Sequence, residues 1–323
     1  MQAAVFVVLA GIALVPVLPF ARSLVAYSAP AALVIGVAAA LVAGNPFAGF
    51  TKALSKVLLQ ASVVLLGFSM DLKVVLQTGQ SGLVYGIASI SAVFALGFVL
   101  QRVLKIRPVT GLLVSTGTAI CGGSAIAAVS TVIDAPAEDI SVAIGAVFLL
   151  NALALLVFPP LGHALSLTQT QFGIWAGIAI HDIASVAGAG VAYGQSALDT
   201  ATAVKLSRVL YLVPLTLLIA WIHHRSVARA PGDERRSVTI PWFVGLFLVA
   251  SALGSYIAIV HAHTSEIKPI AACGFALSLY LIGLGLSRST LKAVGVRPLV
   301  MGAILWIFIS AGTLLFVKWS PGF

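Results

Sequence analysis

Long apolar segments recur along the whole chain and are separated by few charged residues. Each is close to the roughly 17–25 residues that a helix needs to cross the hydrocarbon core of a bilayer. Because backbone groups in lipid must find partners within the protein, segments of this length are expected to be helices. The predicted spans are residues 3–20, 29–43, 52–70, 80–101, 108–133, 138–158, 170–192, 197–222, 240–260, 267–286 and 297–318. The sequence therefore predicts an all-α, polytopic membrane helix bundle with about eleven transmembrane helices.

The composition is that of an integral membrane protein. Hydrophobic residues make up 60% of the 323 and charged residues 8%, whereas soluble domains carry about a quarter charged residues. We expect a single domain over 1–323, with eight helices in 1–222, a cytoplasmic linker at 223–239 and three helices in 240–323. Membrane lipid surrounds it. Basic cytoplasmic loops explain the net charge of +9, so no nucleic acid is expected as a partner.

Basic residues indicate how the helices are oriented. With the N-terminus in the cytoplasm, 12 of the 18 Lys and Arg residues fall in predicted cytoplasmic loops, as the positive-inside rule requires. They are Lys52, Lys56, Arg102, Lys105, Arg107, Arg225, Arg229, Arg235, Arg236, Arg288, Lys292 and Arg297. The acidic segment 134–139 then falls outside and the loop near 159–169 inside. We expect a cytoplasmic N-terminus and a C-terminus on the opposite side.

The predicted fifth span is interrupted at its centre. The stretch GTAICGGSAIAA, residues 117–128, places small and polar residues where a membrane helix is usually apolar. They are Thr118, Cys121, Gly122, Gly123 and Ser124. Adjacent glycines favour unwinding, and the N-terminus of a resumed half-helix offers free N–H groups to an anion. Close helix packing through small residues explains the same pattern equally well.

The predicted seventh span carries ionisable neighbours. His181 and Asp182 lie in the middle of IAIHDIASVAGAG, followed by Ser185. Ionisable groups at membrane depth are costly and usually mark the path of a substrate or ion. Neighbours on a regular helix point about 100° apart, so the pair needs two separate partners or a break in the helix. We favour a transport path over a pair that stabilises the bundle, and His181 is also a candidate for gating by protonation.

Two cations and an amide lie in the predicted spans on either side. Lys205 and Arg208 are three residues apart, so they share one face of the eighth span. A compact charge beside a planar fork suits an oxyanion. The alternative is that both side chains lie shallow and extend to the interface. Asn151 in the sixth span is more typical of a helix–helix contact than of a ligand.

The sequence carries no motif of a common catalytic or metal site. It has no G-x-S-x-G, no Walker A and no H-E-x-x-H pattern. Cys121 and Cys273 form neither a disulfide framework nor a metal-ligand spacing. Cys121, His181 and Asp182 are the residue types of a thiol site, but a thiolate at membrane depth needs a specific activating environment. We therefore expect a protein that is not an enzyme and that has no cofactor and no bound metal.

Two pairs of segments resemble each other within the chain. LLGFSMDLKVVLQTG (65–79) aligns without gaps to LIGLGLSRSTLKAVG (281–295), and the span count gives them opposite directions, as in an inverted repeat. Residues 117–128 align to GIAIHDIASVAG (177–188), but the span count gives these two the same direction, which conflicts with a simple inverted repeat. Each match is equally compatible with a repeat and with coincidence in so apolar a chain.

Four of these segments together resemble a family of bacterial inner-membrane proteins that carries the label of sulfate exporter. They are GTAICGGSAIAA, AGIAIHDIASVAGAG, ATAVKLSRVLYLVP and LIGLGLSRSTLKAVGVRPLVMG. The resemblance runs from about residue 30 to the C-terminus and is specific because all four occur in order. The family often has AIHDTSSV where this chain has AIHDIASV, so Ile183 and Ala184 replace two hydroxyl groups.

The resemblance implies a secondary transporter related to cation:proton antiporters and bile-acid symporters. Such folds have inverted repeats, a panel domain, a core domain and two broken helices that cross at the midplane, here the fifth and seventh spans. The expected substrate is a small anion such as sulfate, sulfite or an organosulfonate, exported with a proton or Na⁺ as the coupling ion. The resemblance further implies location in the bacterial inner membrane and a homodimer, so that the C-terminus, whose side the basic residues predict, is expected in the periplasm.

Residues of the substrate site follow from the interrupted spans and the resemblance together. The candidates are Thr118, Cys121, Gly122, Gly123, Ser124, Asn151, His181, Asp182, Ser185, Lys205 and Arg208. Asp182, with His181, is the candidate for the coupling ion. Two other functions remain open: a cation/proton antiporter that uses Asp182 as its ion site, and a membrane enzyme or sensor without flux.

Overall fold

The structure is a computed structural model that describes residues 11, 25–226, 242–286, 288, 292 and 294–319. The predicted first span lies almost wholly outside these residues, as does most of the predicted linker. The helices are α2 (Val25–Ala43), α3 (Ala48–Gly67), α4 (Leu72–Val103), α5 (Pro108–Ala119), α6 (Gly123–Val132), α7 (Ala137–Ala164), α8 (Gln169–Ala179), α9 (Ile183–Tyr193), α10 (Gln195–Val209), α11 (Leu212–Ser226), α12 (Trp242–Tyr256), α13 (Ala258–Ala262), α14 (Thr264–Leu284) and α16 (Val296–Trp319).

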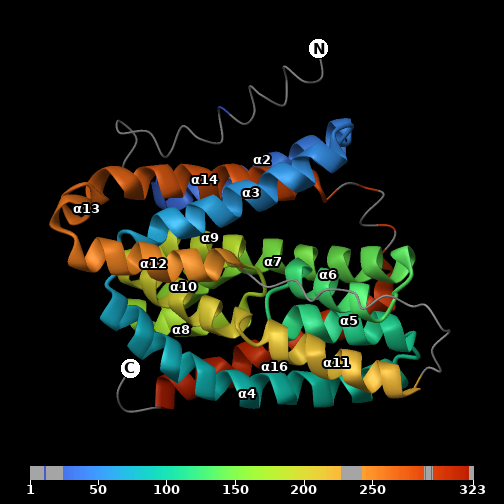
Figure 1. Cartoon of the computed structure of the whole chain (residues 1–323). Helices are drawn as coiled ribbons and strands as arrows, with labels where there is room; N and C mark the ends of the chain where they lie inside the picture. Colours follow the sequence, from blue (N-terminus) through green and yellow to red (C-terminus); the bar gives the residue numbers. More distant parts are fainter. Residues whose placement is uncertain are drawn as a thin grey trace, which may run out of the picture.

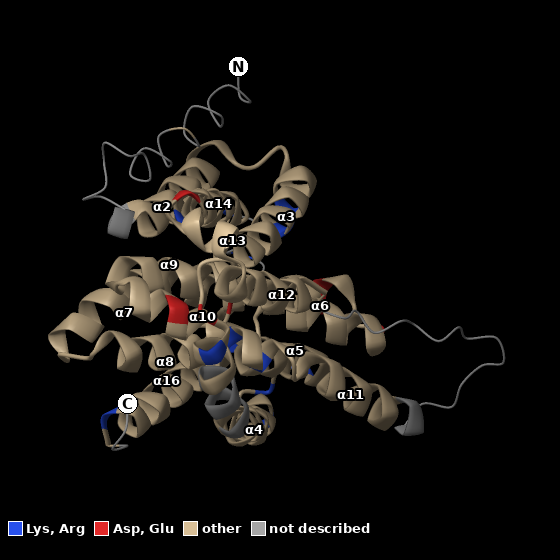
Figure 2. Cartoon of the chain, turned by 60° about the vertical axis from the view of Figure 1, so that its left-hand side comes forward, with Lys and Arg blue, Asp and Glu red and all other residues tan. Residues whose placement is uncertain are grey.

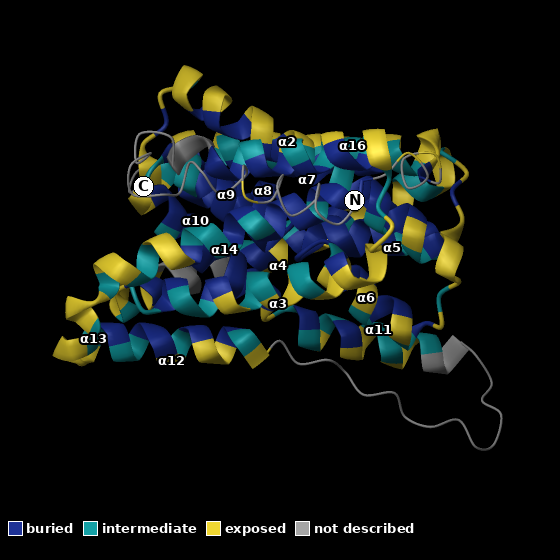
Figure 3. Ribbon diagram, turned by 90° about the horizontal axis from the view of Figure 1, so that it is seen from above, coloured by how far each residue is buried: buried dark blue, intermediate teal, exposed yellow. Residues whose placement is uncertain are grey.

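Long apolar helices confirm the predicted class. Within the described residues, six helical segments are long and apolar enough to cross a membrane: α3, α7, α14, α16, the second part of α4, and α10 with α11. Shorter apolar helices lie within α2, α6, α9 and α12. Figure 1 shows these helices running side by side, and Figure 3 shows that buried residues gather in the middle of the bundle. The chain is an all-α, multi-pass membrane helix bundle.

Both predicted interruptions are present. The fifth span is divided into α5 and α6 by Ile120–Gly122, and the seventh into α8 and α9 by Ile180–Asp182. Gly122 has φ 66° and ψ −127°, a backbone conformation that residues with a side chain rarely adopt. The course of the chain after each interruption differs from the expected crossing helices.

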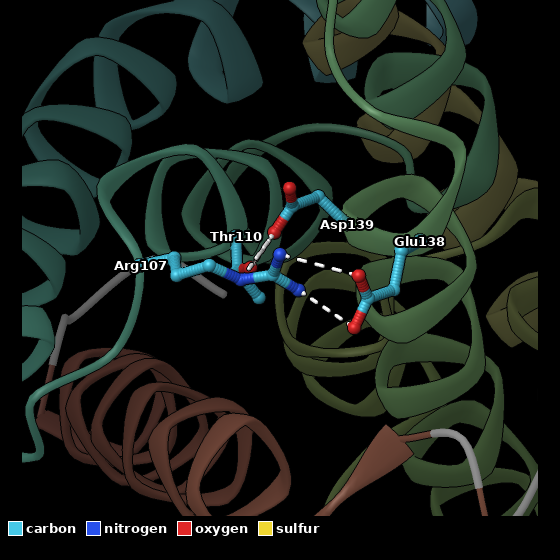
Figure 4. Close-up of polar contacts among 4 residues, drawn as sticks. All are labelled: Arg107, Thr110, Glu138 and Asp139. Carbon is cyan, nitrogen blue, oxygen red and sulfur yellow. Dashed lines mark hydrogen bonds and ion pairs between the residues drawn. The ribbon is translucent and has the colours of Figure 1, made fainter.

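The first interrupted segment turns back to the end from which it enters. Arg107, just before α5, lies 3.1 Å from a Glu138 oxygen and 3.3 Å from an Asp139 oxygen at the start of α7. Thr110 in the first turn of α5 also donates a hydrogen bond to Asp139 (Figure 4). A crossing segment of this length would separate these residues by the thickness of a membrane. α5 and α6 therefore form a re-entrant hairpin, which we call hairpin 1.

The second interrupted segment also turns back, from the opposite end. The Tyr193 hydroxyl at the end of α9 donates to the Leu167 carbonyl before α8 at 2.6 Å, and its ring stacks on Phe172 in α8 at 3.8 Å. The Ser196 amide donates to the Gln169 side chain at 2.9 Å. α8 and α9 therefore form hairpin 2. We call the two faces of the bundle the Arg107 end and the Tyr193 end, because α7 connects them along its 28 residues.

Three sequence-based expectations are corrected by the hairpins. The acidic segment 134–139 lies at the Arg107 end together with the basic residues, and the loop after α7 lies at the Tyr193 end. The two reversals cancel, so the helices after hairpin 2 keep their predicted directions. The aligned segments 117–128 and 177–188 enter from opposite ends, which removes the conflict with an inverted repeat.

Helix boundaries follow the internal repeat. The alignment that pairs Leu65 with Leu281 brings Ala48–Gly67 onto Thr264–Leu284, with ends that match to within one residue. It also brings α2 onto α12 and α4 onto α16. Hairpin 1 followed by α7 repeats as hairpin 2 followed by α10 and α11. The contacts agree, because α2–α14 matches α3–α12, α4–α5 matches α16–α8, and α5–α7 matches α8–α10.

The helices form two groups. α2, α3, α12, α13 and α14 pack on one another and are called the covering layer here. α4 to α11 and α16 form the hairpin layer (Figures 1 and 2). The layers meet mainly where α9 of hairpin 2 packs against α2 and α14. A side chain on Gly188 would come within 2.9 Å of Ala29 and 3.0 Å of Leu279, so glycine allows this close approach.

Cysteine labelling from the two sides of the membrane distinguishes a hairpin from a crossing helix. We expect Ala137→Cys, exposed at the first residue of α7, to react with an impermeant maleimide from the same side as Arg102→Cys, because hairpin 1 returns the chain to its starting end. Gln195→Cys, exposed at the Tyr193 end, should react from the other side. Reaction of Ala137→Cys from the side that labels Gln195→Cys would contradict hairpin 1.

Candidate functional site at the hairpin tips

The tips of the two hairpins meet beside the midpoint of α7. Asn151 accepts a hydrogen bond from the His181 backbone amide at 3.0 Å, so α7 holds the tip of hairpin 2. A Cβ on Gly122 would lie 3.5 Å from the Asp182 Cβ and 3.6 Å from the Asn151 amide nitrogen. Irregular backbone at membrane depth is tolerated only where it is buried in protein or lines a cavity. The two tips thus meet beside Asn151, a polar side chain of the long helix α7.

Two cations of α10 hold the tip of hairpin 1. Arg208 donates to the Ala119 carbonyl and, at 2.7 Å, to the Ser89 hydroxyl of α4. The Lys205 ammonium lies 3.4 Å from the Ile120 carbonyl. The last carbonyls of a helix lack partners within it and carry the negative end of its dipole. The two cations therefore stabilise the C-terminus of α5 at the centre of the bundle.

The half-helices that begin at the tips have different N-termini. Asp182 caps α9, because its two oxygens accept from the Ser185 amide at 2.8 Å and the Ser185 hydroxyl at 2.6 Å. Gly122 precedes α6 and offers no side-chain cap. At the start of α6 the Ala125 amide contacts the Cys121 side chain, whereas at the start of α9 Asp182 and Ser185 satisfy each other.

Several buried polar atoms around the tips have no hydrogen-bond partner among the described residues. They are Thr118 Oγ1, Asn151 Nδ2, both ring nitrogens of His181, Thr202 Oγ1 and Arg208 Nε. A buried polar group without a partner costs about 1–3 kcal/mol, so such groups are rare unless they serve a ligand or water. Most of these atoms are donors, which suits a solute rich in acceptors.

Most of the candidate residues come together in the structure. Cys121, Gly122, Asn151, His181, Asp182, Ser185, Lys205 and Arg208 lie at the tips or contact a tip residue. Gly123 faces the ring of Phe148, and Ser124 is exposed on the outer side of α6. Thr118 is buried in the last turn of α5. Ser89 and Thr202 were not predicted, because a single hydroxyl in a long apolar helix carries no signal of its own.

Positive charge is buried at this junction. Lys205 is 1% exposed and Arg208 is fully buried, so neither side chain reaches the interface. Among the described residues, no carboxylate oxygen lies within 4.0 Å of their nitrogens, and the ion pairs found there all belong to Arg107. Asp182 is the one carboxylate at the tips, and Ser185 occupies both of its oxygens. Buried cations without a paired carboxylate favour an anionic partner.

Replacing Gly122 is expected to disturb the tip through the backbone. In Gly122→Ala the new methyl group would lie at least 3.4 Å from every neighbour, so crowding is not the cause. The cost is the positive φ, for which we expect a loss of about 1–3 kcal/mol in the free energy of unfolding. Thermal unfolding in detergent measures it. Gly312→Ala, at a helical position with no atom within 4 Å, is the control and should be neutral or stabilising. Equal melting of both variants would contradict this account.

Comparisons with known proteins place the chain in a family. The family model described as "Conserved hypothetical protein 698" matches residues 4–302. A UPF0324 membrane protein from Porphyromonas gingivalis is 45% identical over 293 residues, covering 89% of this chain and 86% of the relative. The relative from Bdellovibrio bacteriovorus is 43% identical, and the match covers 89% of this chain and 88% of the relative. The relative from Bacteroides thetaiotaomicron is 41% identical, and the match covers 89% of this chain and 86% of the relative. No solved structure matches the chain. The protein therefore belongs to the conserved hypothetical protein 698 family, whose relatives are called UPF0324 membrane proteins.

Proposed function

We propose that the protein is a secondary active transporter that exports a small anion, such as sulfate, sulfite or an organosulfonate. The observation that carries this proposal is the junction of the two hairpin tips, where Lys205 and Arg208 are buried without a paired carboxylate among the described residues. Half-helices that end at mid-membrane are typical of transporters, where their termini contact the substrate or coupling ion. The choice of sulfur oxyanions rests on the family resemblance.

The residues at the tips have separate roles in this proposal. The start of α6, which has no side-chain cap from Gly122, binds the anion together with the unpaired donors of Asn151 and His181. Lys205, which makes one long contact to the Ile120 carbonyl, supplies charge. Asp182, with His181, carries the coupling proton or interacts with Na⁺ when its bonds to Ser185 open.

Access alternates when the hairpin layer moves against the covering layer. In this proposal the hairpin layer is the core domain and the covering layer is the panel domain. The protein lies in the bacterial inner membrane, with the Arg107 end in the cytoplasm and the C-terminus in the periplasm. This orientation is supported by the basic residues that flank α5 at the Arg107 end. A homodimer belongs to the proposal by family analogy.

Uptake of labelled anions into proteoliposomes tests the proposal. We expect exchange of labelled sulfate, sulfite or a short sulfonate, with loss of exchange in Lys205→Gln and normal exchange in Lys56→Gln, a cation on α3 far along the chain from the tips. Each of these anions should also protect Cys121, which is 4% exposed at the tip of hairpin 1, from a thiol reagent.

Two outcomes would overturn anion transport. Na⁺-driven proton movement after a pH jump, lost in Asp182→Asn and without exchange of any anion, would show a cation/proton antiporter. Turnover of a compound in detergent, without vesicles, would show an enzyme.

A further inference from the structure

The internal symmetry of the chain is broken where the hairpins meet the covering layer. α9 of hairpin 2 packs against α2 and α14. Under the repeat, α9 corresponds to α6, α2 to α12 and α14 to α3. In the part of the chain that the structure describes, α6 makes no extensive contact with α12 or α3. One hairpin is therefore docked on the covering layer and its counterpart is not.

Burial of the two arms differs in the same way. Ala184, Ala187 and Gly188 on α9 are all buried. Their aligned counterparts on α6 are Ser124 and Ala127, which are exposed, and Ala128, which is half-buried. Small side chains on a membrane helix allow another helix to approach closely. The outer face of α6 thus has the residue sizes of a helix contact but is open.

The corresponding surface of the covering layer is open as well. Gly188 meets Ala29 of α2, and the repeat takes Ala29 to Gly245 of α12. Gly245 is exposed, and a Cβ at this position would have no atom within 4 Å. The expected symmetric contact joins Gly245, which is exposed, to Ala128, which is half-buried and also packs against the main core.

We propose that the protein has a second conformation, in which α6 packs on α12 and α3 through Ala128 and Gly245 while α9 leaves α2 and α14. The physical reason is that two symmetry-related faces of the hairpin layer fit two symmetry-related faces of the covering layer, and the chain shows one of these contacts here. The second conformation is inferred from the repeat and from the burial of the helices. The inference therefore does not depend on which solute the protein carries.

A pair of cysteines tests the second conformation in membrane vesicles. Ala128→Cys combined with Gly245→Cys should form a crosslink within one chain on oxidation, identified by mass spectrometry of the linked peptides. Gly245 is exposed with open space around it and Ala128 is half-buried and small, so the variant is expected to fold. The matched control combines Ala128→Cys with Gly312→Cys on α16, another glycine with open space around it. Single-cysteine variants report any crosslink to Cys121 or Cys273.

The result that supports the proposal is a crosslink yield at least several-fold above the control pair. A yield equal to the control, with and without ion gradients, would overturn it. A crosslink between two chains would assign the face of α6 to a dimer contact and would also overturn it. Crosslinking needs no substrate, so its outcome is separate from that of the transport assay: a positive crosslink with no flux of any anion would refute the proposed function alone.

Discussion

Oxidation of a variant that carries Ala29→Cys and Gly188→Cys is expected to stop anion flux, and reduction should restore it. The Ala29 Cβ lies 2.9 Å from the position of a Cβ on Gly188, close to the roughly 3.5–4.5 Å that a disulfide needs. The bond would tie α2 of the covering layer to α9 of hairpin 2. If transport requires the layers to move against each other, the tie leaves the site intact and removes the movement.

A second pair provides the matched control within one layer. In Gly177→Cys with Val204→Cys, the Cβ atoms would also lie 2.9 Å apart, but the bond would join α8 to α10 inside the hairpin layer. Flux should persist after oxidation of this pair. Equal loss of flux in both pairs would show that any crosslink damages the protein, and full flux through the oxidised Ala29–Gly188 pair would contradict movement between the layers. Flux is followed in the proteoliposome exchange assay, before and after reductant.

Hydropathy predicted which segments are helical, but it did not predict that two of them reverse direction and form hairpins. An apolar segment of about 25 residues is long enough for one crossing or for two half-crossings joined by a tip, and its composition is the same in both cases. The break was visible in Gly122 and in the adjacent His181 and Asp182. The reversal depends on the φ of 66° at Gly122 and on contacts such as Arg107 with Asp139, which join residues far apart in the sequence.

Charge counting could not detect the hairpins either. The two reversals cancel, so only the segment 134–139 and the loop after α7 change sides, and neither carries a Lys or Arg residue, which leaves the basic bias unchanged. The segment 134–139 changes sides, but acidic residues contribute little to orientation. One sequence signal did point to the hairpins. An inverted repeat requires the aligned segments 117–128 and 177–188 to run in opposite directions, whereas the span count gave them the same direction. The conflict between the directions of these two segments was thus more informative about the hairpins than the composition was.

The sequence predicted the charged residues of the candidate site, but it did not predict the groups that these residues contact. Lys205 and Arg208 stood out because cations are rare inside membrane spans. The sequence suggested that they face a substrate, whereas the structure shows them against the α5 carbonyls. Their role in holding the tip and a role in binding an anion are compatible, because Arg208 Nε has no partner among the described residues.

Replacement of Arg208 is expected to release the tip of hairpin 1. Its fork reaches the Ala119 carbonyl and the Ser89 hydroxyl at once, and a lysine has no second planar donor for this geometry. In Arg208→Gln the buried carbonyl also loses a charged partner, which costs about 1–3 kcal/mol or more. We expect both Arg208→Lys and Arg208→Gln to lower the melting temperature in detergent and to lose flux, with the larger loss of stability in Arg208→Gln.

The reactivity of Cys121 separates release of the tip from loss of an anion ligand. Cys121 is 4% exposed beside the carbonyls that Arg208 and Lys205 hold, so a loosened tip should react faster with maleimide. Ser89→Ala is the matched control, since it removes one of the two Arg208 contacts and keeps the bond to Ala119; its effect on labelling should be small. Unchanged labelling of Cys121 in Arg208→Gln, together with lost flux, would mean that Arg208 acts on the solute and not on the tip.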